Sequence, residues 1–296
     1  MDGKGVLEVR AGIEPTFADL QSAASPLCHR TSRGVLYRGW TWHGSSIYRS
    51  GPESAAAVIF RAPQPRAQSQ PTMDLTPSVD PFIEPRLHMV DSQVRPNRVT
   101  DPRILGAMRT LPRERFLPPD LTPRAYADED VPLGNGRVLM QPMATARLIQ
   151  LLEPAAGERA LVVAAGVGYG AAVLAACGVR VTALEEDERL LALARPALTA
   201  FAPAVSVAAG LLAAGWPSEA PYDLILLEGA VTAPPPNVVG QLRQEAGRLV
   251  MVLRTSGAPG QAALGEATQA GLQLRPAFDC STPLIPSLVP PPTFAF

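Results

Sequence analysis

One carboxylate and a pair of glycines are the best candidates for chemistry in this chain. Glu185 ends an apolar run, Val179–Leu184, while Gly166 and Gly168 lie in a turn that ends an earlier apolar run, Ala160–Ala164. A carboxylate at the end of a parallel strand can accept hydrogen bonds from both hydroxyls of a ribose. Glycines in a strand-to-helix turn let the backbone approach a ligand closely. These residues therefore predict a nucleoside-binding site.

Both features also have a purely structural interpretation. Gly166 and Gly168 would fit an ordinary tight turn, and Glu185 precedes the acids Glu186–Glu188, which would stabilise the N-terminus of a helix. Four consecutive acids exceed what helix capping requires, so Glu185 can bind a ribose while the others cap. The helix after the glycine turn directs its N-terminal amides towards that turn, which favours an anionic group there, such as a carboxylate.

Alternating strands and helices must position these residues. Apolar runs of strand length cover 160–164, 179–184, 205–208, 222–227 and 248–253, and helical runs cover 170–177, 188–200 and 238–244. This alternation predicts an α/β fold with a doubly wound, mostly parallel sheet and helices on both faces. Two extended runs in 271–296, including Thr293–Phe296, would add a closing hairpin and make a seven-stranded sheet.

The chain before the sheet is predicted to be helical and rich in loops. Val99–Pro102 offers a helix start, with Thr100 or Asp101 as the cap and proline in the first turn, and Gln141-Pro142 opens another helix. We therefore divide residues 73–296 into an N-terminal helical and loop part, 73–158, and a Rossmann-like sheet, 159–296.

Residues 1–72 differ from the rest of the chain. They contain two of the three tryptophans, yet their apolar residues show no sustained strand or helix period. We expect a disordered extension. The run Ala11–Arg33 also looks like the translation of a transfer-RNA gene, in which case translation begins at Met73 and the extension is a mis-annotation.

Composition limits the partners of the protein. The net charge of −1 gives no general attraction to nucleic acid or to anionic membranes. Three cysteines and three histidines are scattered, so we expect no metal site, and the cysteine pattern fits a reducing cytoplasm. No uninterrupted apolar segment has the length of a membrane span. The sequence thus favours a cytoplasmic monomer that binds neither nucleic acid nor membrane.

A series of short motifs follows in a characteristic order from about Met89 to Phe296. The series comprises Pro112–Phe116, Ala125-Tyr126 with Asp130, Pro132–Gly134, Gln141-Pro142, Gly166–Tyr169, Ala183–Glu185, Gly215-Trp216, Pro221–Asp223, Gln241-Leu242 and Gly247–Val250. In order and spacing this part of the chain resembles the protein-L-isoaspartate O-methyltransferase family. Asp130 and Gln141-Pro142 are the motifs that separate this family from other S-adenosylmethionine methyltransferases.

The resemblance implies a seven-stranded methyltransferase sheet and S-adenosyl-L-methionine as methyl donor. The implied reaction is methylation of the α-carboxylate of L-isoaspartyl residues in damaged proteins or peptides, a protein-repair reaction. The implied cofactor-binding positions are Ala164, Gly166, Gly168, Glu185 and Leu211. The family's catalytic hydroxyl position is Met140 here, so the resemblance leaves the catalytic residue unknown.

Four positions depart from the family pattern. Val162 stands where the family has Asp, Ala164 where it has the first turn glycine, Leu211 where it has an acid, and Met140 where it has Ser. These changes support an alternative, a non-catalytic relative that kept the fold and lost the cofactor. A nicotinamide-dependent dehydrogenase is less well supported, because the turn has too few glycines.

Overall fold

The computed structural model describes residues 36–37, 40–43, 46–49, 60–61, 80–255 and 258–290, and the chain divides into two compact units, Met1–Thr76 and Pro77–Phe296. In the first unit the backbone forms an antiparallel sheet of β1 (Leu36–Tyr37), β2 (Trp40–His43), β3 (Ser46–Arg49) and β4 (Phe60–Arg61), paired in sequence order. The other positions of 1–72, for which we predicted disorder or a later translation start, lie outside the described residues.

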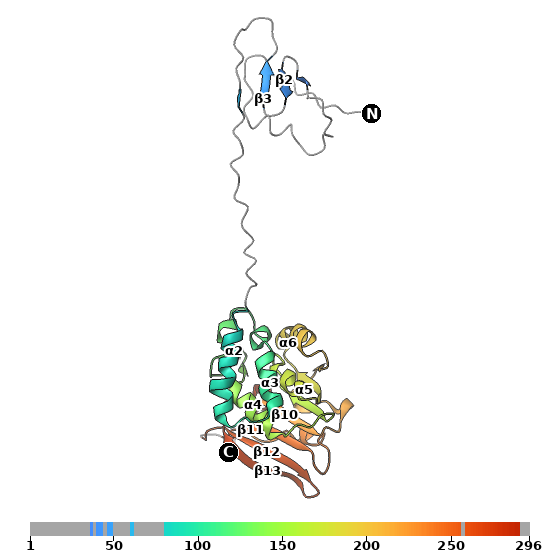
Figure 1. The fold of residues 1–296 in the computed structure, drawn as a ribbon. Helices are drawn as coiled ribbons and strands as arrows, with labels where there is room; N and C mark the ends of the chain where they lie inside the picture. Colours follow the sequence, from blue (N-terminus) through green and yellow to red (C-terminus); the bar gives the residue numbers. More distant parts are fainter. Residues whose placement is uncertain are drawn as a thin grey trace, which may run out of the picture. The chain divides into compact units, whose positions relative to one another are not determined.

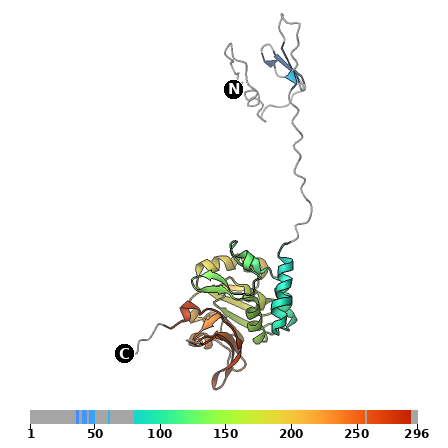
Figure 2. The ribbon, with the colours of Figure 1, turned by 90° about the vertical axis from the view of Figure 1, so that its left-hand side faces the viewer.

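The second unit is built on a seven-stranded sheet with the order β13-β12-β11-β10-β7-β8-β9. The five parallel strands are β7 (Arg159–Val163), β8 (Arg180–Glu185), β9 (Ser206–Ala209), β10 (Leu224–Val231) and β11 (Arg248–Leu253). The hairpin of β12 (Gln261–Thr268) and β13 (Gly271–Asp279) continues the sheet in antiparallel pairing. Figure 2 shows this orange-to-red hairpin at one end of the sheet. The predicted α/β class and strand number are confirmed.

The position of the closing hairpin was predicted wrongly. We expected both of its strands within 271–296, but the first begins ten residues earlier, at Gln261. Its sequence, QAALGEAT, is rich in residues that favour helices, yet every one of its residues from Gln261 to Glu266 pairs with β11. Pairing to a buried neighbour outweighs local propensity here. Thr293–Phe296 lies outside the described residues.

Helices cover both faces of the sheet. As predicted, α5 (Tyr169–Ala176) and α6 (Glu188–Phe201) connect parallel strands, while α7 (Pro236–Val239) is shorter than expected. Upstream, α3 (Pro102–Thr110) and α4 (Pro142–Leu151) start where the Asp-Pro and Gln-Pro motifs place them. The capping prediction is confirmed at α3, where the Asp101 carboxylate accepts a hydrogen bond from the Arg103 amide at 2.8 Å.

Several elements of the structure were not predicted from the sequence. They are the helix α2 (Ile83–Met89), the π-helical turn η1 (Val90–Val94), the two-stranded hairpin of β5 (Val131–Gly134) and β6 (Arg137–Leu139), and the 3-10 turns η2 (Arg95–Asn97), η3 (Arg113–Phe116), η4 (Thr122–Arg124), η5 (Leu212–Ala214), η6 (Pro217–Glu219) and η7 (Pro286–Leu288). In Figure 1, α2, α3 and α4 lie together beside α5.

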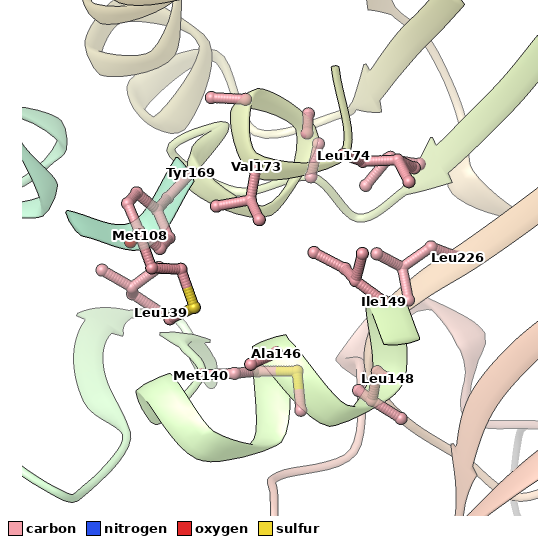
Figure 3. Packing of buried hydrophobic residues seen from close by; sticks show 14 of the residues in the cluster. Met108, Leu139, Met140, Ala146, Leu148, Ile149, Tyr169, Val173, Leu174 and Leu226 are labelled. Atoms are coloured by element: carbon pink, nitrogen blue, oxygen red, sulfur yellow. The ribbon is translucent and has the colours of Figure 1, made fainter. Parts of the chain in front are cut away.

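The core has two parts, one on each face of the sheet. Alternate residues of the strands point to opposite faces, so Val162 belongs to one cluster and Val163 to the other. The larger cluster contains side chains of α3 to α6, and Figure 3 shows Ile149 of α4 facing Val173 of α5 within it. The smaller cluster contains residues of η5 and α7. Both faces of β7 are therefore covered by the core.

Candidate cofactor site

The carboxyl ends of β7 and β8 bring the predicted acid and the glycine turn together. Glu185 is the last residue of β8 and is 1 % exposed. The Gly166 amide donates a hydrogen bond to Glu185 Oε2 at 2.7 Å. The amides of Glu186 and Asp187 donate to Oε1 at 2.9 and 3.0 Å, and Asp187 also caps α6. These three backbone amides fix the orientation of the Glu185 carboxylate.

The turn after β7 needs a left-handed backbone at three positions. Ala164, Gly166 and Gly168 have φ values of 60°, 58° and 87°. Gly168 has a second constraint, because a Cβ there would lie 2.8 Å from Leu198 Cδ1. Glycine adopts this conformation freely, but Ala164 keeps its methyl group at a cost of about 1–2 kcal/mol. The turn therefore keeps the shape of a three-glycine turn despite the substitution.

Arg137 is a member of the site that the sequence did not reveal. It comes from β6, its side chain is 6 % exposed, and it forms a two-pronged ion pair with Glu185: Nη1 lies 2.8 Å from Oε1 and Nη2 lies 2.9 Å from Oε2. Nη2 also donates to the carbonyl of Ala164 at 2.8 Å. The Asn135-Gly136 turn was the available signal, since it indicates a hairpin. Such a hairpin would place Arg137 and Leu139 on one face.

Glu228 is a second carboxylate that the sequence did not single out. It lies in β10, next to β7, at the point where successive strand connections turn in opposite directions. In open α/β sheets this is where ligands bind. Gly170 makes room for it, because a Cβ at position 170 would overlap the Glu228 carboxylate.

The surroundings of Glu228 favour its neutral form. Burial raises the pKa of Glu228 to about 8, although Arg137 and Arg113 act in the opposite direction. The residue as a whole is half-buried. Within 80–255 and 258–290, no group donates a hydrogen bond to its carboxylate. A free acceptor therefore lies beside the Arg137–Glu185 pair.

The Pro112–Phe116 motif contributes a buried arginine that fixes the backbone near the site. Arg113 is fully buried, and it donates from Nε to the Ala125 carbonyl at 2.7 Å and from Nη2 to the Met140 carbonyl at 2.6 Å. Its guanidinium carbon lies 4.8 Å from the centre of the Tyr169 ring. Burial lowers the pKa of Arg113. The motif thus fixes the backbone just before α4.

The departures from the family pattern have different locations. Met140 is buried and brings no hydroxyl; the nearby Thr145 hydroxyl donates to its carbonyl at 3.4 Å. Val162 is 0 % exposed in the core, and Leu211 is 72 % exposed just after β9. Neither gives the site a polar side chain.

Asp130 has a structural role in the described contacts. Its Oδ1 accepts from the Gln141 amide at 2.7 Å, and its Oδ2 accepts from the Thr282 hydroxyl at 2.8 Å. Asp130 therefore ties the start of α4 to the segment after β13. Among the residues with described positions, no group of three or more His, Cys, Asp or Glu is arranged to hold a metal ion, and no helix is long and apolar enough to cross a membrane.

Comparison with known proteins identifies the family. The family model described as protein-L-isoaspartate(D-aspartate) O-methyltransferase matches residues 86–263, more than half of the chain. A protein-L-isoaspartate O-methyltransferase of Methylorubrum extorquens is 40 % identical over 188 residues, which cover 64 % of this chain and 81 % of that protein. One from Aeropyrum pernix is 39 % identical over 181 residues, covering 60 % and 69 %.

Solved structures show the same fold. A protein-L-isoaspartate O-methyltransferase structure aligns with a TM-score of 0.58 at 21 % identity, covering 68 % of this chain and 65 % of that one. A second, from Plasmodium falciparum in complex with S-adenosyl-L-homocysteine, aligns with a TM-score of 0.57 at 17 % identity, covering 68 % and 97 %. With the seven-stranded sheet and the motif series in place, the chain belongs to the protein-L-isoaspartate O-methyltransferase family.

Proposed function

We propose that this protein transfers a methyl group from S-adenosyl-L-methionine to the α-carboxylate of L-isoaspartyl residues in damaged proteins. The observation that carries the proposal is Glu185 at the carboxyl end of β8, hydrogen-bonded to the amide of the Gly166 turn. Relatives that share this part of the chain bear the name of that activity. The resulting ester would then form a succinimide, which reopens in part to normal aspartate.

The residues at the site fit a nucleoside-containing cofactor. Glu185 would accept hydrogen bonds from the two ribose hydroxyls in place of Arg137, and the glycines of the turn, Gly166 and Gly168, let the backbone approach the ligand. Leu211, exposed beyond β9, would give an apolar contact to the base. When bound, the cofactor supplies a methyl group already activated by a positively charged sulfur.

The acceptor needs little chemical help from the protein. A carboxylate is ionised at neutral pH, so it is itself the nucleophile and no general base is required. The protein has to hold the carboxylate oxygen in line with the methyl group, and positioning of this kind can supply much of the rate. Arg113 contributes by fixing the Met140 carbonyl, and the buried Met140 side chain helps to exclude water.

Radiolabelled methyl transfer tests the proposal. An isoaspartyl peptide should become labelled, whereas the same peptide with normal aspartate should not. Glu185→Gln should weaken the binding of S-adenosyl-L-homocysteine by about 10- to 100-fold, because a hydrogen bond to a charged group contributes about 1.5–3 kcal/mol. Glu188→Gln, in the exposed first turn of α6, is the control.

The alternative, a non-catalytic relative, has one structural observation in its favour. Arg137 takes both oxygens of Glu185, and Val162 and Leu211 provide no replacement acid. Absence of calorimetric binding at saturating S-adenosyl-L-homocysteine would support that alternative and contradict the methyltransferase proposal.

We also propose a cytoplasmic monomer that does not bind nucleic acid, in which residues 73–296 carry the activity. The net charge of −1 and the two buried free thiols, Cys177 and Cys280, support this proposal. Burial raises the pKa of Cys177 to about 11, so this thiol stays protonated and unreactive. Light scattering of the purified protein measures the oligomeric state, and a mass of twice 31.3 kDa would contradict it.

A further inference from the structure

The ion pair between Arg137 and Glu185 uses the same two carboxylate oxygens that a ribose would need. The two guanidinium nitrogens approach the two carboxylate oxygens at 2.8 and 2.9 Å. Two neighbouring ribose hydroxyls would approach the same two oxygens in the same forked arrangement. With three backbone amides, Glu185 receives hydrogen bonds from five N–H groups and has no acceptor position left.

We propose that Arg137 occupies the ribose subsite in the cofactor-free protein, and that cofactor binding moves its guanidinium from Glu185 to Glu228. This inference rests on the proposed function. It makes Arg137 a residue that sets cofactor affinity, because part of the binding free energy is used to break the Arg137–Glu185 pair.

Glu228 is the carboxylate best placed to accept Arg137. A buried guanidinium that loses its partner without gaining another is strongly unfavourable, so displacement requires a second acid. Glu228 lies on β10, beside β7, and no described residue donates a hydrogen bond to it. Arg137 Nη2 donates to the carbonyl of Ala164, and Val163 before it pairs with Leu227, the residue before Glu228, so Arg137 reaches the level of Glu228 in the sheet. Its other charged neighbours are Arg113 and Glu185.

The exchange leaves Arg137 with a carboxylate partner in both states. Before binding, Arg137 neutralises Glu185. After binding, the ribose hydroxyls satisfy Glu185, and Arg137 stabilises the ionised form of Glu228. The Glu228 carboxylate lies directly against Gly170 of α5, where no side chain intervenes.

Calorimetric titration with S-adenosyl-L-homocysteine tests the proposal on the full chain. Arg137→Met removes the competing charge and keeps an unbranched apolar side chain, so the Kd of the variant should fall by about tenfold or more. Arg180→Met is the control, because Arg180 is exposed at the opposite end of β8 and its Kd should not change. If the wild-type protein binds and Arg137→Met binds equally or more weakly, the exchange is contradicted, while the proposed function stands. If neither binds, both proposals fail.

Two smaller ligands, adenosine and adenine, distinguish the contribution of the ribose to binding from that of the base. Adenosine contains the ribose and adenine does not. Arg137→Met should strengthen binding of adenosine and leave that of adenine unchanged. An equal gain for both fragments would contradict competition at the ribose.

A double-mutant cycle tests the role of Glu228. Glu228→Gln should weaken binding of S-adenosyl-L-homocysteine in the wild-type background, because Arg137 then has no charged partner to move to. In the Arg137→Met background the same change should have no effect. A loss of equal size in both backgrounds would show that Glu228 contacts the ligand itself, and would overturn the exchange. Thermal melting of each variant checks that it is folded.

Discussion

At the scale of single residues, the glycine turn contains a measurable strain at Ala164. Its φ of 60° is in the left-handed region, where a side chain costs about 1–2 kcal/mol. Ala164→Gly should therefore increase the free energy of unfolding by about 1 kcal/mol, measured by urea denaturation. Ala165→Gly is the matched control, since Ala165 does not have positive φ and glycine there should destabilise. Destabilisation by Ala164→Gly would contradict the strain.

Glu228 predicts a dependence of stability on pH. Its pKa is raised from 4.5 to about 8 in the folded protein, because the charged form is poorly solvated. Between these values the folded protein keeps a proton that the unfolded chain has lost, so stability falls as pH rises, by up to about 1.4 kcal/mol per pH unit. The stability that the protonated Glu228 contributes is fully present below the pKa of the unfolded chain, and it is lost as pH rises towards the pKa of about 8 in the folded protein.

Glu228→Gln should remove this dependence. Relative to the wild-type protein, the variant should gain thermal stability as pH increases from 5 towards about 8. Thermal unfolding followed by circular dichroism across this pH range measures the effect. The exposed Glu188→Gln should leave the slope unchanged. Parallel pH curves for the wild-type protein and Glu228→Gln would show that Glu228 is ionised throughout.

The sequence identified only those site residues whose role depends on local context. Glu185 and Gly166 could be found because Glu185 ends a strand and Gly166 lies in the turn after one, and parallel strands end at the same edge of a sheet. Arg137 is 48 positions from Glu185, and no local pattern records their pairing. Glu228 follows four buried apolar residues within β10, and such a continuous apolar run does not predict which way the next, charged side chain points.

At the scale of elements, Arg113 connects η3 to the backbone before α4. Its guanidinium donates hydrogen bonds to two carbonyls, those of Ala125 and Met140. Among the described side chains, only the Thr145 hydroxyl, at 3.4 Å from the Met140 carbonyl, also donates to either of them. Lysine cannot reproduce this fork. Arg113→Lys should lower the free energy of unfolding by about 2–3 kcal/mol and weaken peptide binding through the displaced Met140.

Arg115→Lys provides the matched comparison for Arg113→Lys. Arg115 belongs to the same motif and is exposed, so its replacement should change stability by less than about 0.5 kcal/mol. Urea denaturation of both variants measures the difference. Similar small changes for both would mean that the buried bridge contributes little to stability.

Elements with strong local signals were predicted well, and those that depend on pairing were not. Proline and capping residues located the starts of α3 and α4. The strand β12 was missed because its alanines carry no strand preference, and only the pairing with β11 makes it a strand. The hairpin β5–β6 was missed because β6 has three residues, too few to show alternation.

At the scale of the whole molecule, the order of strands places the site. Connections from β7 lead to β8 and β9 on one side, and the chain later returns to β10 and β11 on the other. In open α/β sheets ligands bind at such a reversal, which lies here at the carboxyl ends of β7 and β10. Glu185, Gly166 and Glu228 all lie at this end of the sheet, although they come from three different strand ends. The topology, rather than any one motif, brings them together.

The division into two units predicts that the catalytic unit is stable without the first. Among residues with described side chains, both hydrophobic clusters lie entirely between Met89 and Leu288. Because this core supplies most of the folding free energy, a chain beginning at Met73 should have the same melting temperature as the full chain. It should also bind S-adenosyl-L-homocysteine with the same Kd, since every proposed cofactor contact lies between Arg137 and Glu228. Calorimetry and thermal melting of the two chains side by side measure both quantities. A tenfold weaker Kd in the shorter chain, about 1.4 kcal/mol, would place part of the cofactor site before Met73.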